Sequence, residues 1–148
     1  MANHVKTSRS PRSIRDVMTP APRGVDSGDS VVQAARAMRD HDIGDVLVTE
    51  NGRLVGVVTD RDLVIRALAD GREPSRTTVG EVCSRELSVL GPEDSVDQAV
   101  DLMRRGAIRR LPIVEDGRPV GIVSLGDLAR ARDPESALGE ISEAPPNR

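Results

Sequence analysis

The sequence of 148 residues contains no phenylalanine, tyrosine or tryptophan, and its only cysteine is Cys83. Without aromatic rings, the chain lacks the stacking platform on which single-stranded nucleic acids are usually bound. A single cysteine excludes an intramolecular disulfide framework. No apolar stretch approaches the roughly 20 residues of a membrane-spanning helix. Any membrane role would therefore come through a partner.

Clustered positive charge is also missing. The net charge is -3, and the basic residues are interspersed with acids, whereas affinity for a phosphate backbone comes from clustered lysine and arginine. The composition therefore disfavours nucleic-acid binding. Residues 1–12 are polar and lack the apolar region of a signal peptide, so we expect a cytoplasmic protein. The length corresponds to about one ordinary domain and leaves no room for a separate catalytic domain of normal size.

The sequence contains two copies of one unit. Residues 29–34 and 94–99 share the pattern D-S-V-x-Q-A at an offset of 65 residues. The same offset pairs Gly56 with Gly121 and Asp62 with Asp127 without a gap. Because the shared residues fall at helix caps, turns and apolar positions, both copies should adopt one fold.

Each copy is predicted to run helix, strand, hairpin turn, strand, helix. Capping boxes at Ser30–Gln33 and Ser95–Gln98 open helices with one apolar face. The predicted apolar positions are Val31, Ala34, Ala35 and Met38 in the first helix, and Val96, Ala99 and Met103 in the second. The dipeptides Asn51-Gly52 and Asp116-Gly117 separate apolar runs and predict β-hairpins. A second helix should begin near Asp60 and near Leu125.

These patterns divide the chain into five parts. We expect a mobile N-terminal segment at 1–12, a first repeat at 13–69, a linker at 70–77, a second repeat at 78–132 and a mobile C-terminal tail at 133–148. Two half-buried units of this size would each be marginal alone, so we expect their sheets to pack into one core.

A short signature follows each hairpin. It reads G-V-V-T-D-R-D-L over Gly56–Leu63 (the first signature) and G-I-V-S-L-G-D-L over Gly121–Leu128 (the second signature). Two such stretches at a fixed offset resemble the CBS-domain family, and the match covers Ile14 to Ala131. The resemblance implies an α/β fold of tandem β-α-β-β-α repeats with pseudo-twofold symmetry, sheets packed together and helices outside.

The hydroxyl and acid of each signature have two interpretations. Thr59 with Asp62 and Ser124 with Asp127 match a helix-opening pattern, so capping alone could explain both pairs. The resemblance implies instead that the hydroxyl meets a nucleotide phosphate and the acid accepts the hydroxyls of a ribose. Both interpretations use the same geometry, and the sequence leaves them open.

The second site has the fuller set of ligand candidates. Arg109 and Arg110 precede a strand that is similar to one in the gamma subunit of AMP-activated kinase, where a basic pair meets nucleotide phosphates. By that resemblance the two arginines and Ser124 contact phosphate, and Asp127 accepts the ribose. The family pattern adds Thr19 from the first repeat, and Ile43, Gly44 and Asp45 around the base.

The first site departs from the pattern. Gly44 and Asp45 stand where the second copy has its two arginines, and an acid would repel a phosphate. This site, for which the resemblance implies Thr59, Asp62, Ser84 and Ile108, should therefore be empty or suit a less anionic adenosine compound. The first copy opens with V-M-T-P at Val17–Pro20, which resembles the family pattern. In the second copy Cys83 stands in place of the methionine, so the sequence leaves open whether the apolar contact of that methionine is kept.

No catalytic arrangement or metal-ligand spacing is found, so we expect no enzyme activity, no metal and no required cofactor. The leading hypothesis is a homodimeric, ligand-sensing regulator that binds an adenosine-type nucleotide and acts on an unidentified target protein. Residues 31–38 and 64–68 could supply the dimer face. The alternatives are a dimeric interaction scaffold without ligand, and an accessory subunit of a nucleotide-metabolising or transport protein. Residues 41–44 and 59–62 look similar to stand-alone bacterial CBS pairs of the hypoxic-response type, which implies a stress-related role.

Overall fold

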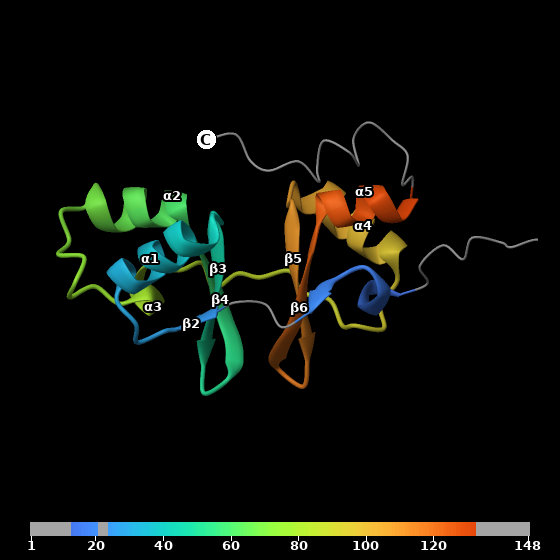
Figure 1. The fold of residues 1–148 in the computed structure, drawn as a ribbon, viewed down its shortest axis with the longest axis horizontal. Coiled ribbons are helices and arrows are strands. Elements are labelled where there is room, and N and C mark those ends of the chain that lie inside the picture. Colours follow the sequence, from blue (N-terminus) through green and yellow to red (C-terminus); the bar gives the residue numbers. More distant parts are fainter. Residues whose placement is uncertain (1–12, 21–23, 133–148) are drawn as a thin grey trace, which may run out of the picture. The chain divides into compact units, whose positions relative to one another are not determined.

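A computed structural model describes residues 13–20 and 24–132. The predicted mobile ends, 1–12 and 133–148, lie outside the described residues. The chain divides into two compact units (Figure 1). The first-signature unit comprises Ala21–Ser88 with Asp116–Pro119, and the second-signature unit comprises Met1–Pro20, Val89–Glu115 and Val120–Arg148.

The first-signature unit is built on a three-stranded sheet in the order β2-β3-β4. Strand β2 is parallel to β3, and β3 is antiparallel to β4. Its elements are β2 (Gly24–Asp26), α1 (Val31–His41), β3 (Asp45–Glu50), β4 (Arg53–Thr59), α2 (Asp60–Asp62), the π-helix η2 (Leu63–Leu68) and α3 (Val79–Val82). The predicted order of helix, strand, turn, strand and helix is confirmed.

Helix α1 begins at the predicted capping box. The Gln33 amide donates to Ser30 Oγ at 3.2 Å, and the Ser30 amide donates to Gln33 Oε1 at 2.7 Å. Val31, Ala34 and Met38 are buried as predicted. The prediction for Ala35 was wrong, because it is exposed and lines a groove between α1 and η2. The buried stripe is therefore narrower than the apolar pattern indicated.

Both hairpins turn at the predicted dipeptides. Asn51 and Gly52 have φ angles of 53° and 78°, and Asp116 and Gly117 have the same two values. Positive φ at both central residues is the requirement of a type I′ turn, which glycine and asparagine or aspartate satisfy at low cost. The sequence signal for these turns is therefore confirmed.

The helix after β4 is wider than an ordinary α-helix. After the short α2, hydrogen bonds of the i to i+5 type join the Ala69 amide to the Val64 carbonyl at 2.8 Å and the Arg72 amide to the Ala67 carbonyl at 3.0 Å. The sequence predicted a helix here, but no pattern distinguished a π-helix from an α-helix. In the second-signature unit the corresponding helix is α5, an α-helix.

The second-signature unit repeats the same plan. Its elements are the 3-10 helix η1 (Ile14–Asp16), β1 (Thr19–Pro20), α4 (Val96–Gly106), β5 (Arg110–Glu115), β6 (Arg118–Ser124) and α5 (Leu125–Arg132). The sheet order is β1-β6-β5. The second predicted capping box is present, with the Gln98 amide 3.1 Å from Ser95 Oγ. Val96, Ala99 and Met103 are buried, which confirms the predicted apolar face.

The start of each repeat joins the strands of the other repeat. We call residues 14–20 and their counterparts 79–85 the opening segments. Thr19 of the first opening segment pairs with Ile122 of β6, and Ser84 of the second forms an isolated bridge with Val57 of β4. These two pairings correspond to each other at the offset of 65 residues, so both units complete their sheets in the same way.

The signature glycines allow this close approach. A Cβ atom added to the buried Gly56 would lie 2.8 Å from Cys83 Sγ and 2.8 Å from the Ser84 carbonyl oxygen. At Gly121 the added atom would meet Met18 Sδ and, at 3.0 Å, the Thr19 carbonyl oxygen. Since a backbone oxygen cannot turn aside as a side chain can, only glycine lets the opening segment lie against the strand.

Gly56→Ala should therefore force the second opening segment away from β4. We expect the free energy of unfolding to fall by about 1–3 kcal/mol, the usual cost of overpacking, in urea denaturation followed by circular dichroism. Gly91→Ala is the matched control, because its added Cβ would lie no closer than 3.7 Å to another atom. Equal stability of the two variants would contradict this explanation of the signature glycine.

Candidate ligand-binding site

The first signature forms a reciprocal cap where β4 passes into α2. The Asp62 amide donates to Thr59 Oγ1 at 3.1 Å, and the Thr59 amide donates to Asp62 Oδ2 at 2.9 Å. The Asp62 side chain is 16% exposed. The predicted helix-opening hydrogen bonds are thus present, and both interpretations of the pair use them.

The second signature repeats this geometry where β6 passes into α5. The Asp127 amide donates to Ser124 Oγ at 3.1 Å, and the Ser124 amide donates to Asp127 Oδ2 at 2.8 Å. The Asp127 side chain is 12% exposed. A carboxylate has about four acceptor positions, so the cap leaves room for further donors on either acid.

An arginine lies against the other oxygen of each carboxylate. Arg66 Nε is 3.8 Å from Asp62 Oδ1, and an Arg130 Nη atom pairs with Asp127 Oδ1. Sequence reasoning missed both arginines. The available signal was a basic residue four positions after the first acid and three positions after the second, a spacing that places side chains on one helix face.

Each opening segment brings a hydroxyl residue to the same face of the sheet as the signature hydroxyl. Thr19 lies opposite Ile122, and Ser124 follows two residues later on β6. Directly opposed residues share a face of an antiparallel pair, as do residues two apart on one strand. The buried Val123 between them points to the other face, into the core. Thr19, Ser124 and Asp127 therefore belong to one unit.

The first-signature unit has the corresponding arrangement. Ser84 lies opposite Val57, and Thr59 follows two residues later on β4. The Ser84 amide and carbonyl both bond to Val57, at 2.9 Å and 3.0 Å. Three of the residues predicted for the first site, Ser84, Thr59 and Asp62, are thus brought into one unit.

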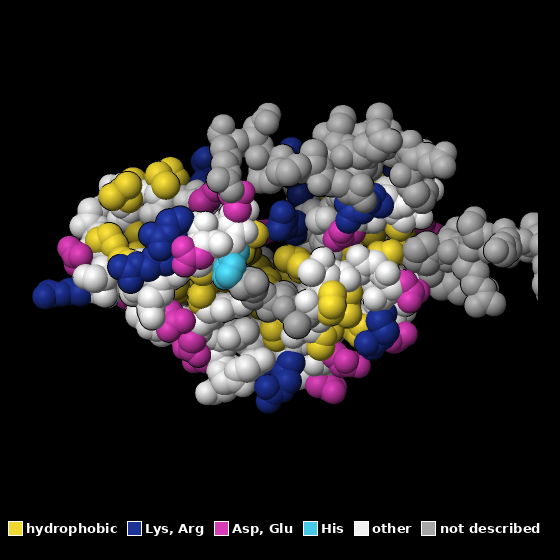
Figure 2. All heavy atoms as spheres, in the orientation of Figure 1, with side chains coloured by type: hydrophobic (Ala, Val, Ile, Leu, Met, Phe, Trp, Pro, Cys, Tyr) yellow, Lys and Arg dark blue, Asp and Glu magenta, His cyan; other side chains and the backbone are white. Residues whose placement is uncertain are grey.

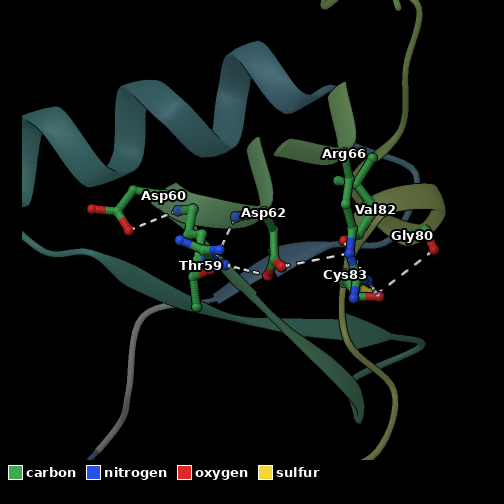
Figure 3. A network of polar contacts seen from close by, with 8 residues as sticks. Thr59, Asp60, Asp62, Arg66, Gly80, Val82 and Cys83 are labelled. Atoms are coloured by element: carbon green, nitrogen blue, oxygen red, sulfur yellow. Dashed lines mark hydrogen bonds and ion pairs between the residues drawn. The ribbon is translucent and has the colours of Figure 1, made fainter. Parts of the chain in front are cut away.

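Cys83 keeps the apolar role that the sequence left open. Its side chain is 7% exposed and belongs to the hydrophobic core of the first-signature unit. Its Sγ atom lies 3.7 Å from the Gly80 carbonyl oxygen (Figure 3). Cys83 packs beside Gly56, as Met18 packs beside Gly121 in the second-signature unit.

The residues that lead into β3 lie beside the first signature. The Asp60 amide donates to the Gly44 carbonyl at 2.9 Å, and Asp45 lies opposite Thr59 in the β3–β4 pairing. An acidic residue thus lies opposite the signature hydroxyl residue. Asp60 adds a second acid, whose Oδ2 is 3.2 Å from a Cβ built on Gly44.

The residues that lead into β5 carry the opposite charge. Arg109 and Arg110 are both exposed, and the Arg109 carbonyl accepts the Leu125 amide at 2.8 Å. The Arg109 side chain lines a groove of about 470 Å³ with Leu125, Ile108 and residues of α4. At matching positions, the first-signature unit therefore has Gly44 and the acid Asp45, whereas the second-signature unit has two bases, Arg109 and Arg110.

Some predicted site residues come from different units. Ile43, Gly44 and Asp45, assigned to the second site, belong to the first-signature unit, and Ile108, assigned to the first site, belongs to the second-signature unit. Their part in a ligand site stays a prediction.

A second groove, of about 460 Å³, runs between α1 and η2. We call it the α1–η2 groove. Three apolar side chains of η2 are strongly exposed: Val64 by 52%, Ile65 by 48% and Leu68 by 67%. Figure 2 shows hydrophobic side chains gathered at the surface over this part of the first-signature unit.

The described residues hold no group of three or more histidine, cysteine or acidic side chains arranged for a metal ion. His41, the last residue of α1, is exposed, and His4 lies outside the described range. Within the same range, no helix is both long and apolar enough to cross a bilayer.

Comparison with known proteins identifies relatives over most of the chain. The chain is 44% identical over 117 residues to the CBS domain-containing protein YhcV of Bacillus subtilis, covering 79% of this chain and 83% of the relative. It is 34% identical over 131 residues to Hypoxic response protein 1 of Mycobacterium tuberculosis, covering 88% and 91%.

Solved structures of CBS-domain proteins have a fold similar to that of this chain. A crystal structure of Hypoxic Response Protein I with two coordinated zinc ions matches at a TM-score of 0.75 and 34% identity, over 81% of this chain and 98% of that one. The CBS domain pair of protein MJ0100, in complex with 5′-methylthioadenosine and S-adenosyl-L-methionine, matches at 0.68 and 28%, over 80% and 97%. The CBS domain family model matches residues 14–68 and 79–133, so the chain belongs to the CBS-domain family as a tandem pair of CBS domains.

Proposed function

We propose that this CBS-domain pair is a regulatory module that binds an adenosine-type nucleotide beside the second signature and performs no catalysis itself. The observation that carries the proposal is the grouping of Thr19, Ser124 and Asp127 in one unit that also contains two exposed arginines, Arg109 and Arg110. The adenosine ligands of the related MJ0100 pair support the ligand class.

The chemistry of this group suits a nucleotide. The Asp127 carboxylate, though bonded to the Ser124 amide and to Arg130, retains acceptor positions for the two hydroxyls of a ribose. The Ser124 hydroxyl accepts the Asp127 amide and can still donate its own proton. Arginine bonds to phosphate are charge-assisted and strong, and Arg109 and Arg110 would supply them.

The first site should have a different preference. Asp45 lies opposite Thr59, and Asp60 lies beside Gly44, so negative charge surrounds the position of a phosphate. A less anionic adenosine compound, such as 5′-methylthioadenosine, would avoid that repulsion. We therefore propose AMP, ADP or ATP for the second site, and an uncharged or cationic adenosine compound for the first.

A second candidate function is an interaction scaffold without ligand. It is favoured by one observation: the hydroxyl and acid of both signatures already form complete capping boxes. In that case Asp127 contributes only cap stability, about 1 kcal/mol.

Calorimetric titration with AMP, ADP, ATP and S-adenosylmethionine separates the two functions. We expect at least one of AMP, ADP and ATP to bind at the second site, and Asp127→Asn to lower its affinity by about a hundredfold, because two charge-assisted bonds to the ribose are lost. Asparagine keeps an acceptor for the Ser124 amide, so the cap should largely survive.

Gln98→Ala is the matched control, since it removes one half of the Ser95–Gln98 capping box in the same unit. It should lower stability without changing affinity. Absence of binding for all four compounds would leave the scaffold as the function.

We also propose that the module is a homodimer joined through the α1–η2 groove. Val64 and Leu68 line the groove and are exposed, as is the neighbouring Ile65, and an exposed apolar surface of this kind marks an interaction site. The family resemblance implies dimers joined through helix faces, so a second copy is the proposed occupant.

Ligand binding would control a target protein only if the ligand binds two dimer shapes with different affinities.

Leu68→Glu should convert the dimer to a monomer, because it places a charge on the most exposed apolar side chain of the groove. Size-exclusion chromatography with light scattering should give twice the chain mass of 15.9 kDa for the wild type and one chain mass for the variant. Val89→Glu makes the same change at an exposed apolar residue outside the groove and should remain dimeric. A monomeric wild type would reject the dimer.

A further inference from the structure

Arg66 connects two parts of the first-signature unit that are distant in sequence. Its Nε atom is 3.8 Å from Asp62 Oδ1, within ion-pair range. One of its Nη atoms lies 3.3 Å from the Val82 carbonyl oxygen and 3.4 Å from the Cys83 carbonyl oxygen. Figure 3 shows the side chain between Asp62 and the Val82–Cys83 segment. One guanidinium group therefore contacts the acid of the first signature and the second opening segment.

One contact of Arg66 ends at Asp62, which is proposed for the first site, and the others end at Val82 and Cys83, which directly precede Ser84 of that site. Asp62 is the proposed ribose acceptor, and the Cys83 carbonyl belongs to the peptide that leads directly into Ser84. Ser84 is in turn fixed to β4 by its two backbone bonds to Val57. Arg66 therefore lies between the Asp62 carboxylate and the segment that leads into Ser84.

The geometry requires an arginine in particular. A guanidinium group is planar and carries five N–H donors, so it can meet a carboxylate on one edge and carbonyl oxygens on another. A lysine ammonium is a single point of charge and cannot span the same three acceptors in one plane. Arg66 is 52% exposed on its side chain, so a change there opens no cavity in the core.

The second repeat is built differently at this point. The offset of 65 residues places Ala131 where the first repeat has Arg66, and the acid Asp127 pairs instead with Arg130, three positions on. The two arginines also lie in helices of different type, Arg66 in the π-helix η2 and Arg130 in the α-helix α5. The acid of each signature is therefore paired with an arginine at a different spacing, four positions on in the first repeat and three in the second.

We infer that Arg66 is a positioning residue of the first site, which holds the Asp62 carboxylate and the segment before Ser84 in the arrangement that accepts one uncharged adenosine compound. The inference rests on the proposed function of the two signatures. Arg66 acts through Asp62 and the Val82–Cys83 carbonyls, and no contact between Arg66 and the ligand is needed.

The test uses the full chain with the second site removed by Asp127→Asn, and 5′-methylthioadenosine as the probe in calorimetry. In this background Arg66→Met should weaken binding by about tenfold, the worth of one charge-assisted interaction. Arg66→Lys should recover only part of the loss. Arg76→Met, which removes an exposed arginine of the same unit, should bind as the parent does.

A double-mutant cycle distinguishes positioning from a general structural role. If Arg66 acts through Asp62, Arg66→Met should cause little further loss once Asp62→Asn is present, so that the two effects are not additive. Unfolding midpoints of the Arg66→Met and Arg76→Met proteins should lie close together. Independent, additive losses, or an equal loss of affinity in Arg66→Met and Arg76→Met, would overturn the inference.

Failure of the inference is separable from failure of the proposed function. No binding of 5′-methylthioadenosine to the Asp127→Asn protein, or unchanged binding in Arg66→Met, overturns the role of Arg66. The second site is tested independently in the Asp62→Asn protein with AMP, ADP and ATP, where binding supports the proposed function whatever Arg66 does.

Discussion

The structure depends on a reciprocal bond between a hydroxyl residue and an aspartate at the point where a strand passes into a helix. In each repeat the acid accepts the amide of the hydroxyl residue, and the hydroxyl accepts the amide of the acid. This cap fixes the end of the strand, the start of the helix and the direction of the carboxylate together. A ligand that uses the remaining acceptor positions of Asp62 or Asp127 would therefore meet an acid that is already oriented.

Much of this could be predicted from sequence because the signals are local. Capping boxes, type I′ turns and apolar periodicity each depend on residues a few positions apart, and the repeat at a fixed offset doubled every signal. The hairpins at Asn51-Gly52 and Asp116-Gly117 and the helix starts at Ser30 and Ser95 are as predicted. Ala35 was misassigned because an apolar residue beside a buried stripe can line a surface groove equally well.

The features missed from sequence are those that depend on distant contacts. The signature glycine matched a pattern, but its reason, the approach of Cys83 and Ser84 to Gly56, appears only in three dimensions. The bonds from Arg66 to the Val82 and Cys83 carbonyls join residues 16 and 17 positions apart. The π-helix likewise has no sequence rule as strong as a cap or a turn. Local pattern thus predicted the framework of each unit, whereas tertiary contacts determine how the candidate site is held.

The two repeats share a framework but differ in charge, with Gly44 and Asp45 in one matching Arg109 and Arg110 in the other. A crystal structure of the protein grown with AMP tests the account most directly. It should place the ribose hydroxyls on the Asp127 carboxylate and the phosphate near Ser124, Arg109 and Arg110. The account would be contradicted by AMP bound elsewhere. It would also be contradicted if crystals grown at a saturating AMP concentration showed Asp127 bonded only to Ser124 and Arg130.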